Sequence, residues 1–309
     1  MAGRRIWVAG HRGMVGSAVV RRLRDLGDDV LTVDRSIVDL RNQPAVELWL
    51  KQNRPDIIVF AAAKVGGILA NDSFPADFIY DNLAIETNII HSAHLSDVDR
   101  LVFLGSSCIY PKFAPQPIRE DALLTGPLEP TNEWYAIAKI AGIKMCQAYR
   151  KQYGRRYISV MPCNLYGPND NFDLQTSHVL PALIRKFHEA KIKGNPEVVV
   201  WGTGAPLREF LHVDDLAKGV VFCMDHFDGY EHINCGAGYE ISIRELAETV
   251  KEAVGFDGRL AFDSSKPDGT PRKLMDSSRL LAMGWKPEIA LKDGIASSYR
   301  WFLDNRADD

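Results

Sequence analysis

A short apolar segment runs directly into a glycine turn near the start of this 309-residue chain, and this transition restricts the fold more than any other feature. Ile6-Trp-Val-Ala9 ends at Gly10, and Gly13 and Gly16 follow at intervals of three. Valine and leucine then recur at helical spacing, which predicts a strand, a tight turn and a helix. Glycines in such a turn let backbone N–H groups approach a pyrophosphate at the helix N-terminus. The segment therefore favours a dinucleotide-binding start to an α/β chain, with a purely structural turn as the alternative.

The same alternation continues through the first half of the chain. Apolar runs predict strands at 30–33, 57–60, 101–104 and 157–161, and helical periodicity predicts helices at 44–50, 76–95 and 134–153. Strands separated by helices indicate an α/β fold with a Rossmann-type, doubly wound parallel sheet. Ligands bind such sheets at the carboxyl ends of the strands, which is where Gly10, Ala61, Ser106 and Asn164 fall.

The pattern loosens after Gly167-Pro168. Helices are expected at 178–191, 243–254 and 291–303, strands at 198–200 and 232–234, and helix caps at Asp214 and Ser242. We infer a smaller C-terminal α/β domain that binds substrate. The predicted Rossmann domain spans 1–167 plus about 209–236, and the predicted substrate domain spans 168–208 and 237–309.

Composition narrows the class of partner and the compartment. The formal net charge is −3, so nothing favours nucleic acid or an anionic membrane as the main partner. The apolar run after Arg4-Arg5 has only four residues, too few for a signal peptide or a membrane span, so we expect a cytoplasmic protein without membrane association. The five cysteines are widely spaced and contain no Cys-x-x-Cys pair, which argues against a disulfide framework and against a metal site.

Tyr135 and Lys139 lie four residues apart in the expected helix 134–153, so their side chains share one face. An ammonium beside a phenol favours the phenolate, so Lys139 is expected to lower the pKa of Tyr135 toward neutral pH. Such a phenol can exchange a proton during carbonyl chemistry. On spacing alone a surface pair is the commoner outcome. The glycine turn and the loop Ser106-Ser-Cys108 favour a redox site.

Together these features resemble the extended short-chain dehydrogenase/reductase family that acts on nucleotide sugars. The resemblance rests on the glycine turn, Ser106 four residues before Tyr110, the pair Tyr135 and Lys139, and the segment Arg208–Asp215. Longer sequence segments, here called phrases, resemble a particular group of enzymes within that family. These enzymes epimerise C3 and C5 of GDP-4-keto-6-deoxy-D-mannose and reduce its C4 ketone with NADPH. The phrases are 10–16, 61–67, 104–111, 129–132 and 266–273. The resemblance covers essentially the whole chain and implies this bifunctional activity.

The resemblance also implies the roles of five side chains. Ser106 and Tyr135 are expected to hold and protonate the C4 oxygen, with Lys139 beside them. Cys108 and His178 are expected to move the protons at C3 and C5, with acid and base unassigned between them. From the residues alone, each of three side chains has a structural alternative. Ser106 could be a loop-capping serine, Cys108 a small buried thiol, and His178 a helix-cap or core histidine.

The predicted cofactor is NADP(H). The resemblance places it against Gly10, Arg12, Gly13, Met14, Val15, Gly16, Arg35, Lys139, Pro162, Asn164, Leu165 and His178. Asp34 directly follows the second expected strand, and an acid there usually bonds the ribose 2′-hydroxyl of NAD. Arg12 and Arg35 can instead hold a 2′-phosphate while Asp34 points away or pairs with one of them. NAD(H) is therefore the alternative.

The predicted substrate is a GDP-sugar. The resemblance assigns Lys186, Trp201, Arg208 and Asp276 to it, and Arg272 is a further candidate. A guanidinium such as that of Arg208 suits a diphosphate, whereas a lysine such as Lys186 is more often a solvated surface residue. A homodimer formed through the two long helices of the first domain is implied by the resemblance alone.

Two other functions use the same fold. A nucleotide-sugar 4,6-dehydratase of this family is expected to carry an Asp-Glu pair after its catalytic Ser or Thr, and Ser107-Cys108 stands in that place here; a 4-epimerase would share the fold as well. A non-catalytic NAD(P)-binding regulator is expected to have lost the tyrosine or the lysine, and both Tyr135 and Lys139 are present.

Overall fold

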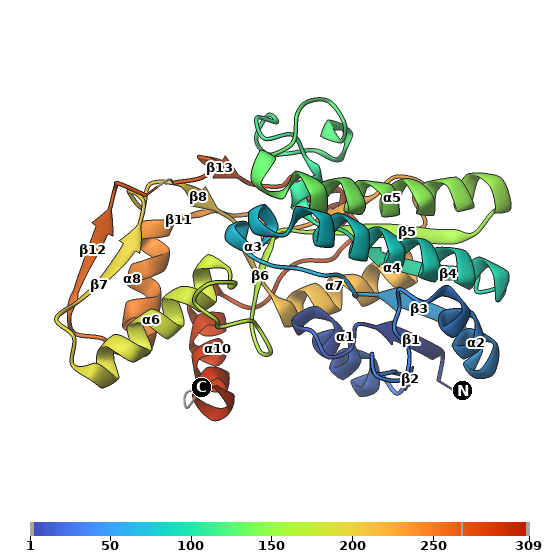
Figure 1. Cartoon of the computed structure of the whole chain (residues 1–309), viewed down its shortest axis with the longest axis horizontal. Coiled ribbons are helices and arrows are strands. Elements are labelled where there is room, and N and C mark those ends of the chain that lie inside the picture. Colours follow the sequence, from blue (N-terminus) through green and yellow to red (C-terminus); the bar gives the residue numbers. More distant parts are fainter. Residues whose placement is uncertain (1–2, 267, 307–309) are drawn as a thin grey trace.

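The computed structural model describes residues 3–266 and 268–306. Residues 1–2 and 307–309, at the ends of the expected domains, and Pro267 of the phrase 266–273 lie outside the described residues. The molecule is elongated: a sheet covered by helices occupies the end that carries the N-terminus, and a smaller group of strands and helices occupies the other end (Figure 1).

The largest sheet in the described part of the chain has six parallel strands in the order β10-β5-β4-β3-β1-β2. The strands are β1 (Arg5–Ala9), β2 (Asp29–Leu31), β3 (Ile57–Phe60), β4 (Arg100–Leu104), β5 (Arg156–Pro162) and β10 (Ile233–Cys235). The predicted doubly wound α/β fold is confirmed. The chain moves outward from β1 to β2 and returns to β3 on the other side of β1, so a ligand crevice is expected at the carboxyl ends of β1 and β3.

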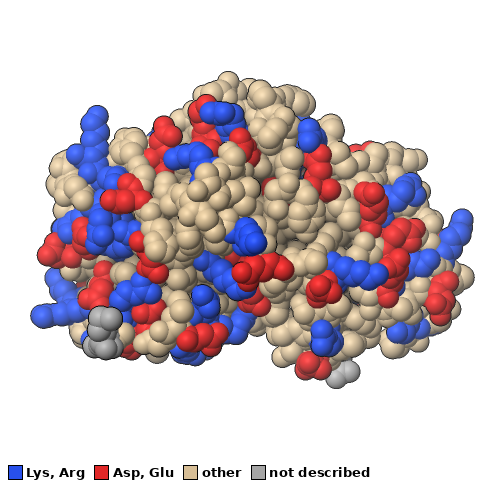
Figure 2. Space-filling view, turned by 180° about the vertical axis from the view of Figure 1, so that it is seen from behind, with Lys and Arg blue, Asp and Glu red and all other residues tan. Residues whose placement is uncertain are grey.

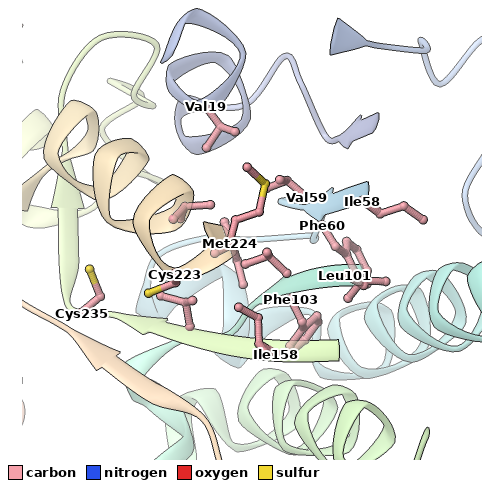
Figure 3. Packing of buried hydrophobic residues seen from close by; sticks show 14 of the residues in the cluster. Val19, Ile58, Val59, Phe60, Leu101, Phe103, Ile158, Cys223, Met224 and Cys235 are labelled. Carbon is pink, nitrogen blue, oxygen red and sulfur yellow. The ribbon is translucent and has the colours of Figure 1, made fainter. Parts of the chain in front are cut away.

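Helices cover both faces of this sheet. On one face α4 (Pro75–Leu95) packs between α2 (Gln43–Asn53) and α5 (Glu133–Tyr153), and on the other face α1 (Met14–Asp25) packs against α7 (Val213–His226). In Figure 3, Val19 of α1 and Met224 of α7 point toward strand residues such as Val59 and Ile158, and all four belong to one buried cluster. Burial from both sides explains why β3 and β4 are continuous apolar runs.

The second strand is shorter than expected. The run 30–33 predicted a strand to Val33, but β2 ends at Leu31. Since β2 is the edge of the sheet, it pairs only with β1, over the three positions from Arg5↔Asp29 to Trp7↔Leu31. Asp34 therefore lies beyond the strand rather than directly after it.

The other end of the molecule has its own hydrophobic core. It is enclosed by α6 (Val179–Lys193), α8 (Ile243–Val254) and α10 (Leu291–Asn305), with β7 (Glu197–Trp201) and β12 (Arg259–Asp263) paired in parallel. The remaining elements are short: α3 (Ile68–Ser73), η1 (Ser107–Ile109), η2 (Glu120–Ala122), η3 (Pro130–Asn132), β6 (Asn164–Tyr166), β8 (Leu207–Arg208), β9 (Phe210–His212), β11 (Ile241–Ser242), β13 (Arg272–Lys273) and α9 (Ser278–Ala282). The domain boundaries given above stay a prediction.

One predicted helix cap is confirmed and one is wrong. The Ser242 hydroxyl accepts a hydrogen bond from the Glu245 N–H at 3.1 Å, and the Glu245 carboxylate accepts one from the Ser242 N–H. These two hydrogen bonds form a capping box at the start of α8. At α7, however, His212 occupies the cap position and its Nδ1 accepts from the Asp214 N–H at 3.2 Å. Asp214 lies inside the first turn, where its negative charge is favoured by the helix dipole.

The surface carries charges of both signs. In Figure 2, Lys and Arg lie among Asp and Glu on the face opposite to that of Figure 1, in keeping with a formal net charge of −3. Within residues 3–266 and 268–306, no helix is long and apolar enough to cross a membrane.

Candidate active site

The glycine turn joins β1 to α1. Gly10 has a φ of +93°, which favours glycine, and a Cβ on Gly16 would overlap the Gly10 carbonyl oxygen. Gly13 occupies the cap position of α1 and contributes only backbone, so the N–H groups of the first turn, at Met14 and Val15, keep their capacity to bind an anion. This turn fits the diphosphate of a dinucleotide.

Asp34 is engaged by two side chains of the same turn, Arg12 and His11. Arg12 Nη2 lies 2.6 Å from its carboxylate, and His11 Nε2 lies 3.2 Å away. The pairing of Asp34 with one of the predicted arginines is thus present. Arg35 extends into solvent, with 73% of its side chain exposed, and its Nε lies 3.8 Å from Asp39. Arg35 is therefore accessible to an incoming phosphate.

The third loop of the crevice begins at the end of β5. Pro162 is the last residue of β5, and Asn164 and Leu165 open β6, which pairs with β9. The Asn164 amide donates to the Glu209 carbonyl oxygen at 2.8 Å, so this side chain ties the loop to the second half of the chain.

Ser106 and Tyr135 meet where β4 enters its loop. Ser106 precedes η1 and accepts a hydrogen bond from the Cys108 N–H at 3.3 Å. Tyr135 lies in the first turn of α5 and is buried. Burial raises the pKa of Tyr135, negative charge on Cys108 and on Glu86 raises it further, and a hydrogen bond with Ser106 opposes the shift. Tyr135 therefore holds its proton, in the form that can donate it.

The expectation that Lys139 lowers the pKa of Tyr135 is wrong for this structure. The Lys139 ammonium donates to the Leu104 carbonyl oxygen at 3.1 Å and lies 3.2 Å from the Glu86 carboxylate. It reaches the Tyr135 ring centroid only at 5.9 Å. Because Glu86 and Leu104 satisfy the ammonium and burial dominates at the phenol, the pKa of Tyr135 moves up instead of down.

Cys108 and His178 come from different loops, and Lys273 lies close to the Cys108 sulfur. Asn132 Nδ2 donates to Cys108 Sγ at 3.2 Å, and Lys273 Nζ lies 3.9 Å from the same sulfur. His178 directly precedes α6 and is exposed. Partial loss of hydration, and after it the positive charge of Lys273, lower the pKa of His178.

Lys186 and Trp201, two of the predicted substrate residues, lie on the second group of elements, on α6 and β7. Lys186 of α6 and Lys266 place their ammonium groups 5.5 and 5.6 Å from the ring of Trp201, which is 64% exposed. Burial lowers the pKa of Lys186, which therefore is not an ordinary solvated lysine.

The other three substrate candidates differ in the protein groups that they already contact. They are Arg208, Arg272 and Asp276. Arg208 on β8 is half-buried and donates to the Leu207 carbonyl oxygen at 2.8 Å. Arg272 is bound to Glu240 at 2.7 Å, so its charge is already matched. Asp276 accepts from the Ser278 N–H at 2.9 Å, beside α9.

A family model described as the NAD dependent epimerase/dehydratase family matches residues 6–236, which include the glycine turn, Ser106, Tyr135 and Lys139. The chain belongs to this family. The matched residues end just after β10, the last strand of the large sheet. The six-stranded sheet with its crevice is therefore the part that this chain shares with the family at large.

Individual relatives match the whole chain. GDP-L-fucose synthase 1 of Arabidopsis thaliana is 63% identical over 302 residues, which cover 97% of this chain and 94% of the relative. GDP-L-fucose synthase of Escherichia coli (strain K12) is 56% identical over 316 residues, with 99% and 98% covered. The solved structure of a GDP-L-fucose synthetase from Naegleria fowleri bound to NADP has a TM-score of 0.92 at 30% identity and covers 99% of this chain and 94% of that chain.

Sequence reasoning missed three polar residues of this site. Glu86 is a carboxylate on the buried face of α4, and a charged residue at a core position of a helix was the available signal. Asn132 and Lys273 belong to phrases that carried the family resemblance, but only the folded chain brings them to the Cys108 sulfur. All five cysteines are free thiols, and Cys108 is the one that is not buried.

Proposed function

We propose that this chain converts GDP-4-keto-6-deoxy-D-mannose to GDP-L-fucose, by epimerisation at C3 and C5 followed by reduction of the C4 ketone. The observation that carries the proposal is the position of Cys108, a partly exposed thiol two residues after Ser106, whose hydroxyl oxygen accepts a hydrogen bond from the Cys108 N–H at 3.3 Å. A thiol at this point adds proton transfer at carbon to a carbonyl-reduction site. Two relatives named GDP-L-fucose synthase, which are 56 and 63% identical to this chain, support the proposed activity.

Epimerisation uses the acidity that a ketone gives to its neighbouring carbons. One of Cys108 and His178 removes the proton from C3 or C5, and the C–H electron pair passes to the C4 oxygen as an enolate. Ser106 and the Tyr135 hydroxyl donate hydrogen bonds to that oxygen and stabilise its charge. The other group of the pair returns a proton to the opposite face of the carbon.

Reduction uses the same oxygen. When bound, the nicotinamide cofactor supplies the hydride that reaches C4. Tyr135 gives its proton to the developing alkoxide, because burial keeps the phenol protonated until a stronger base forms beside it. Arg208 and Lys186 hold the diphosphate, and Trp201 offers an exposed aromatic face for the guanine.

The test separates the activity from its alternatives. The purified protein is incubated with NADPH and GDP-4-keto-6-deoxymannose, and the loss of NADPH absorbance and the identity of the product are followed. We expect GDP-L-fucose; a protein that leaves NADPH unoxidised with this substrate would be a regulator or an enzyme with another substrate. Cys108→Ser and His178→Gln should slow solvent deuterium entry at C3 and C5 about 10²-fold or more, while His226→Gln, an exposed control, should not.

The cofactor of this chain is a nicotinamide dinucleotide, and we propose that it is NADP(H). The ion pair of Asp34 with Arg12 offsets the negative charge that repels a 2′-phosphate, and the exposed Arg35 supplies a cation for that phosphate. We expect a higher kcat/KM with NADPH than with NADH. Asp34→Asn should raise that preference about tenfold, corresponding to about 1.4 kcal/mol, while the exposed Asp25→Asn leaves it unchanged. A wild-type preference for NADH would reverse this choice.

The assembly proposed for this chain is a homodimer through α4 and α5. These two long helices lie side by side on one face of the sheet (Figure 1). They expose large apolar side chains, including Tyr80 at 68% on α4 and Ile137 at 36% on α5. The mass in solution tests the proposal: twice the chain mass is expected, and Tyr80→Arg should yield a monomer.

A further inference from the structure

The loop that carries His178 is tied to the first half of the chain by a backbone hydrogen bond. The Gly67 N–H donates to the Thr176 carbonyl oxygen at 2.9 Å. Thr176 lies two residues before His178, which directly precedes α6. Gly67 belongs to the phrase 61–67, which carried the family resemblance but contributes no side chain to the proposed reaction.

Both sides of this contact are held in place by further hydrogen bonds. Asn71 of α3 is buried, and its Nδ2 donates to the Gly66 and Gly67 carbonyl oxygens at 2.7 and 3.0 Å. On the facing loop, the Asp173 carboxylate accepts hydrogen bonds from the N–H and the hydroxyl of Thr176, each at 2.9 Å. Thr176 is therefore fixed by Asp173 through its N–H and by Gly67 through its carbonyl oxygen.

The close approach of the two segments requires glycine at position 67. A Cβ there would lie 2.9 Å from the Ser177 carbonyl oxygen and 3.2 Å from the Thr176 carbonyl oxygen. Backbone atoms cannot rotate away as a flexible side chain can, so a side chain at 67 would push the two segments apart. The φ of Gly67 is −65°, so lack of space, and not backbone conformation, excludes larger residues.

The same segment lies between the two groups proposed for proton transfer. α3 follows Gly67 and packs against η3, and Asn132 of η3 contacts the Cys108 sulfur at 3.2 Å. Gly67 itself contacts the loop that leads to His178. Two groups that exchange protons on opposite faces of one carbon need a fixed separation.

We propose that Gly67 is a positioning residue for epimerisation, because its small size and its N–H set the separation between the loop of His178 and the loop of Cys108. This inference rests on the proposed function. Epimerisation uses both of these side chains at one carbon, whereas reduction of the C4 ketone with protonation by Tyr135 uses neither. A displaced His178 loop should therefore slow epimerisation more than reduction.

Gly67→Ala tests the proposal through its products. The wild type and the variant are incubated with NADPH and GDP-4-keto-6-deoxymannose in heavy water, and deuterium at C3 and C5 and the identity of the reduced sugar are measured. We expect deuterium entry to fall about 10 to 10²-fold, because a misplacement of about 1 Å can cost that much. Part of the reduced sugar should keep the starting configuration at C3 and C5, as we also expect for His178→Gln. The affinity for NADPH should be unchanged.

Matched variants separate position from stability. Gly126→Ala adds a Cβ in an exposed loop, where its nearest contact, the Pro111 side chain, lies 3.4 Å away, and it should leave deuterium entry unchanged. Asn71→Leu is close in size but cannot donate to the Gly66 and Gly67 carbonyl oxygens. It should change the products in the same direction as Gly67→Ala, and it serves if the alanine variant misfolds.

Hydrogen exchange measures the contact without turnover. In the substrate-free protein, the peptide that covers 173–178 should exchange faster in Gly67→Ala than in the wild type, as followed by mass spectrometry. Wild-type exchange of this peptide, or wild-type products from both variants, would overturn the inference. Equal losses of epimerisation and reduction would also overturn it, because Gly67 would then only support the fold. Absence of turnover by the wild type would reject the proposed function while leaving the hydrogen-exchange result intact.

Discussion

The buried pair of Glu86 and Lys139 is expected to make stability depend on pH in the direction opposite to that of an ordinary ion pair. Both side chains are only 2% exposed, with 3.2 Å between Lys139 Nζ and Glu86 Oε1. Burial raises the pKa of Glu86 to about 7 from 4.5, and the Lys139 ammonium only partly opposes this. Between these pH values the folded chain holds a proton that the unfolded chain has released. The contribution of Glu86 to stability is therefore complete below pH 4.5 and is lost as the pH rises to about 7.

The magnitude follows from the two pKa values. The difference between about 7 and 4.5 corresponds to a loss of about 3 kcal/mol in the free energy of unfolding across this window. Glu86→Gln is close in size and neutral at every pH, so it removes this titration. Burial also raises the pKa of Asp170 and of Glu209 to about 7, but both groups titrate alike in the two proteins and cancel in the difference.

Urea denaturation of the wild type and Glu86→Gln at pH 5, 6, 7 and 8 measures this difference. We expect the wild type to lose about 2 to 3 kcal/mol relative to the variant over this range. Glu248→Gln, an exposed change on α8, should follow the wild type at every pH. If the wild type gained stability relative to Glu86→Gln as the pH rose, the attraction of Lys139 would outweigh the cost of burial, and the reasoning would be refuted.

Three further predictions concern single side chains. Tyr135→Phe should lower the rate of C4 reduction about 10² to 10⁴-fold with NADPH affinity unchanged, measured by turnover and by fluorescence titration; reduction at the wild-type rate would exclude Tyr135 as the proton donor. Ser242→Ala should lower the free energy of unfolding by about 1 kcal/mol because it removes the cap of α8, and Ser242→Thr should retain most of it, as thermal unfolding can show. Gly142→Ala should cost about 1 to 3 kcal/mol in urea denaturation, because a Cβ there would overlap the Phe103 ring and lie 2.9 Å from Glu86; an equally stable variant would contradict this packing.

Elements with two packed faces were predicted well from the sequence. The apolar run 57–60 and the period of 134–153 allow few alternatives, and both elements are found within one residue of the expected bounds. The end of β2 was missed because a strand at an edge is limited by its single partner rather than by its own residues. The helix cap at α7 was missed because α7 begins at Val213, two residues earlier than an Asp214 cap would require, and His212, a less common cap residue, accepts from the Asp214 N–H.

In the candidate site, too, some contacts could be predicted from the sequence and others could not. Residues joined by short spacing, such as Ser106 with Cys108 and Tyr135 with Lys139, could be related from the sequence. The partner of Lys139 could not, because Glu86 reaches it from a different helix. The rise in the Tyr135 pKa was missed as well, because its main cause is burial in the folded chain. Lys273 was hidden for the same reason: 165 residues separate it from the sulfur that it approaches.

The late arrival of β10 has a consequence for how the chain is made. β10 completes the sheet by pairing with β5, yet the segment 163–232 is synthesised between the two strands. Until Cys235 leaves the ribosome, β5 presents an unpaired edge, and until His226 leaves it, α1 lacks the complete helix α7 that packs on it. An exposed edge of this kind pairs readily with other chains, so nascent or truncated forms ending near 167 are expected to aggregate. Engineers who exchange substrate-binding segments between relatives therefore need to keep 209–236 with the first half of the chain.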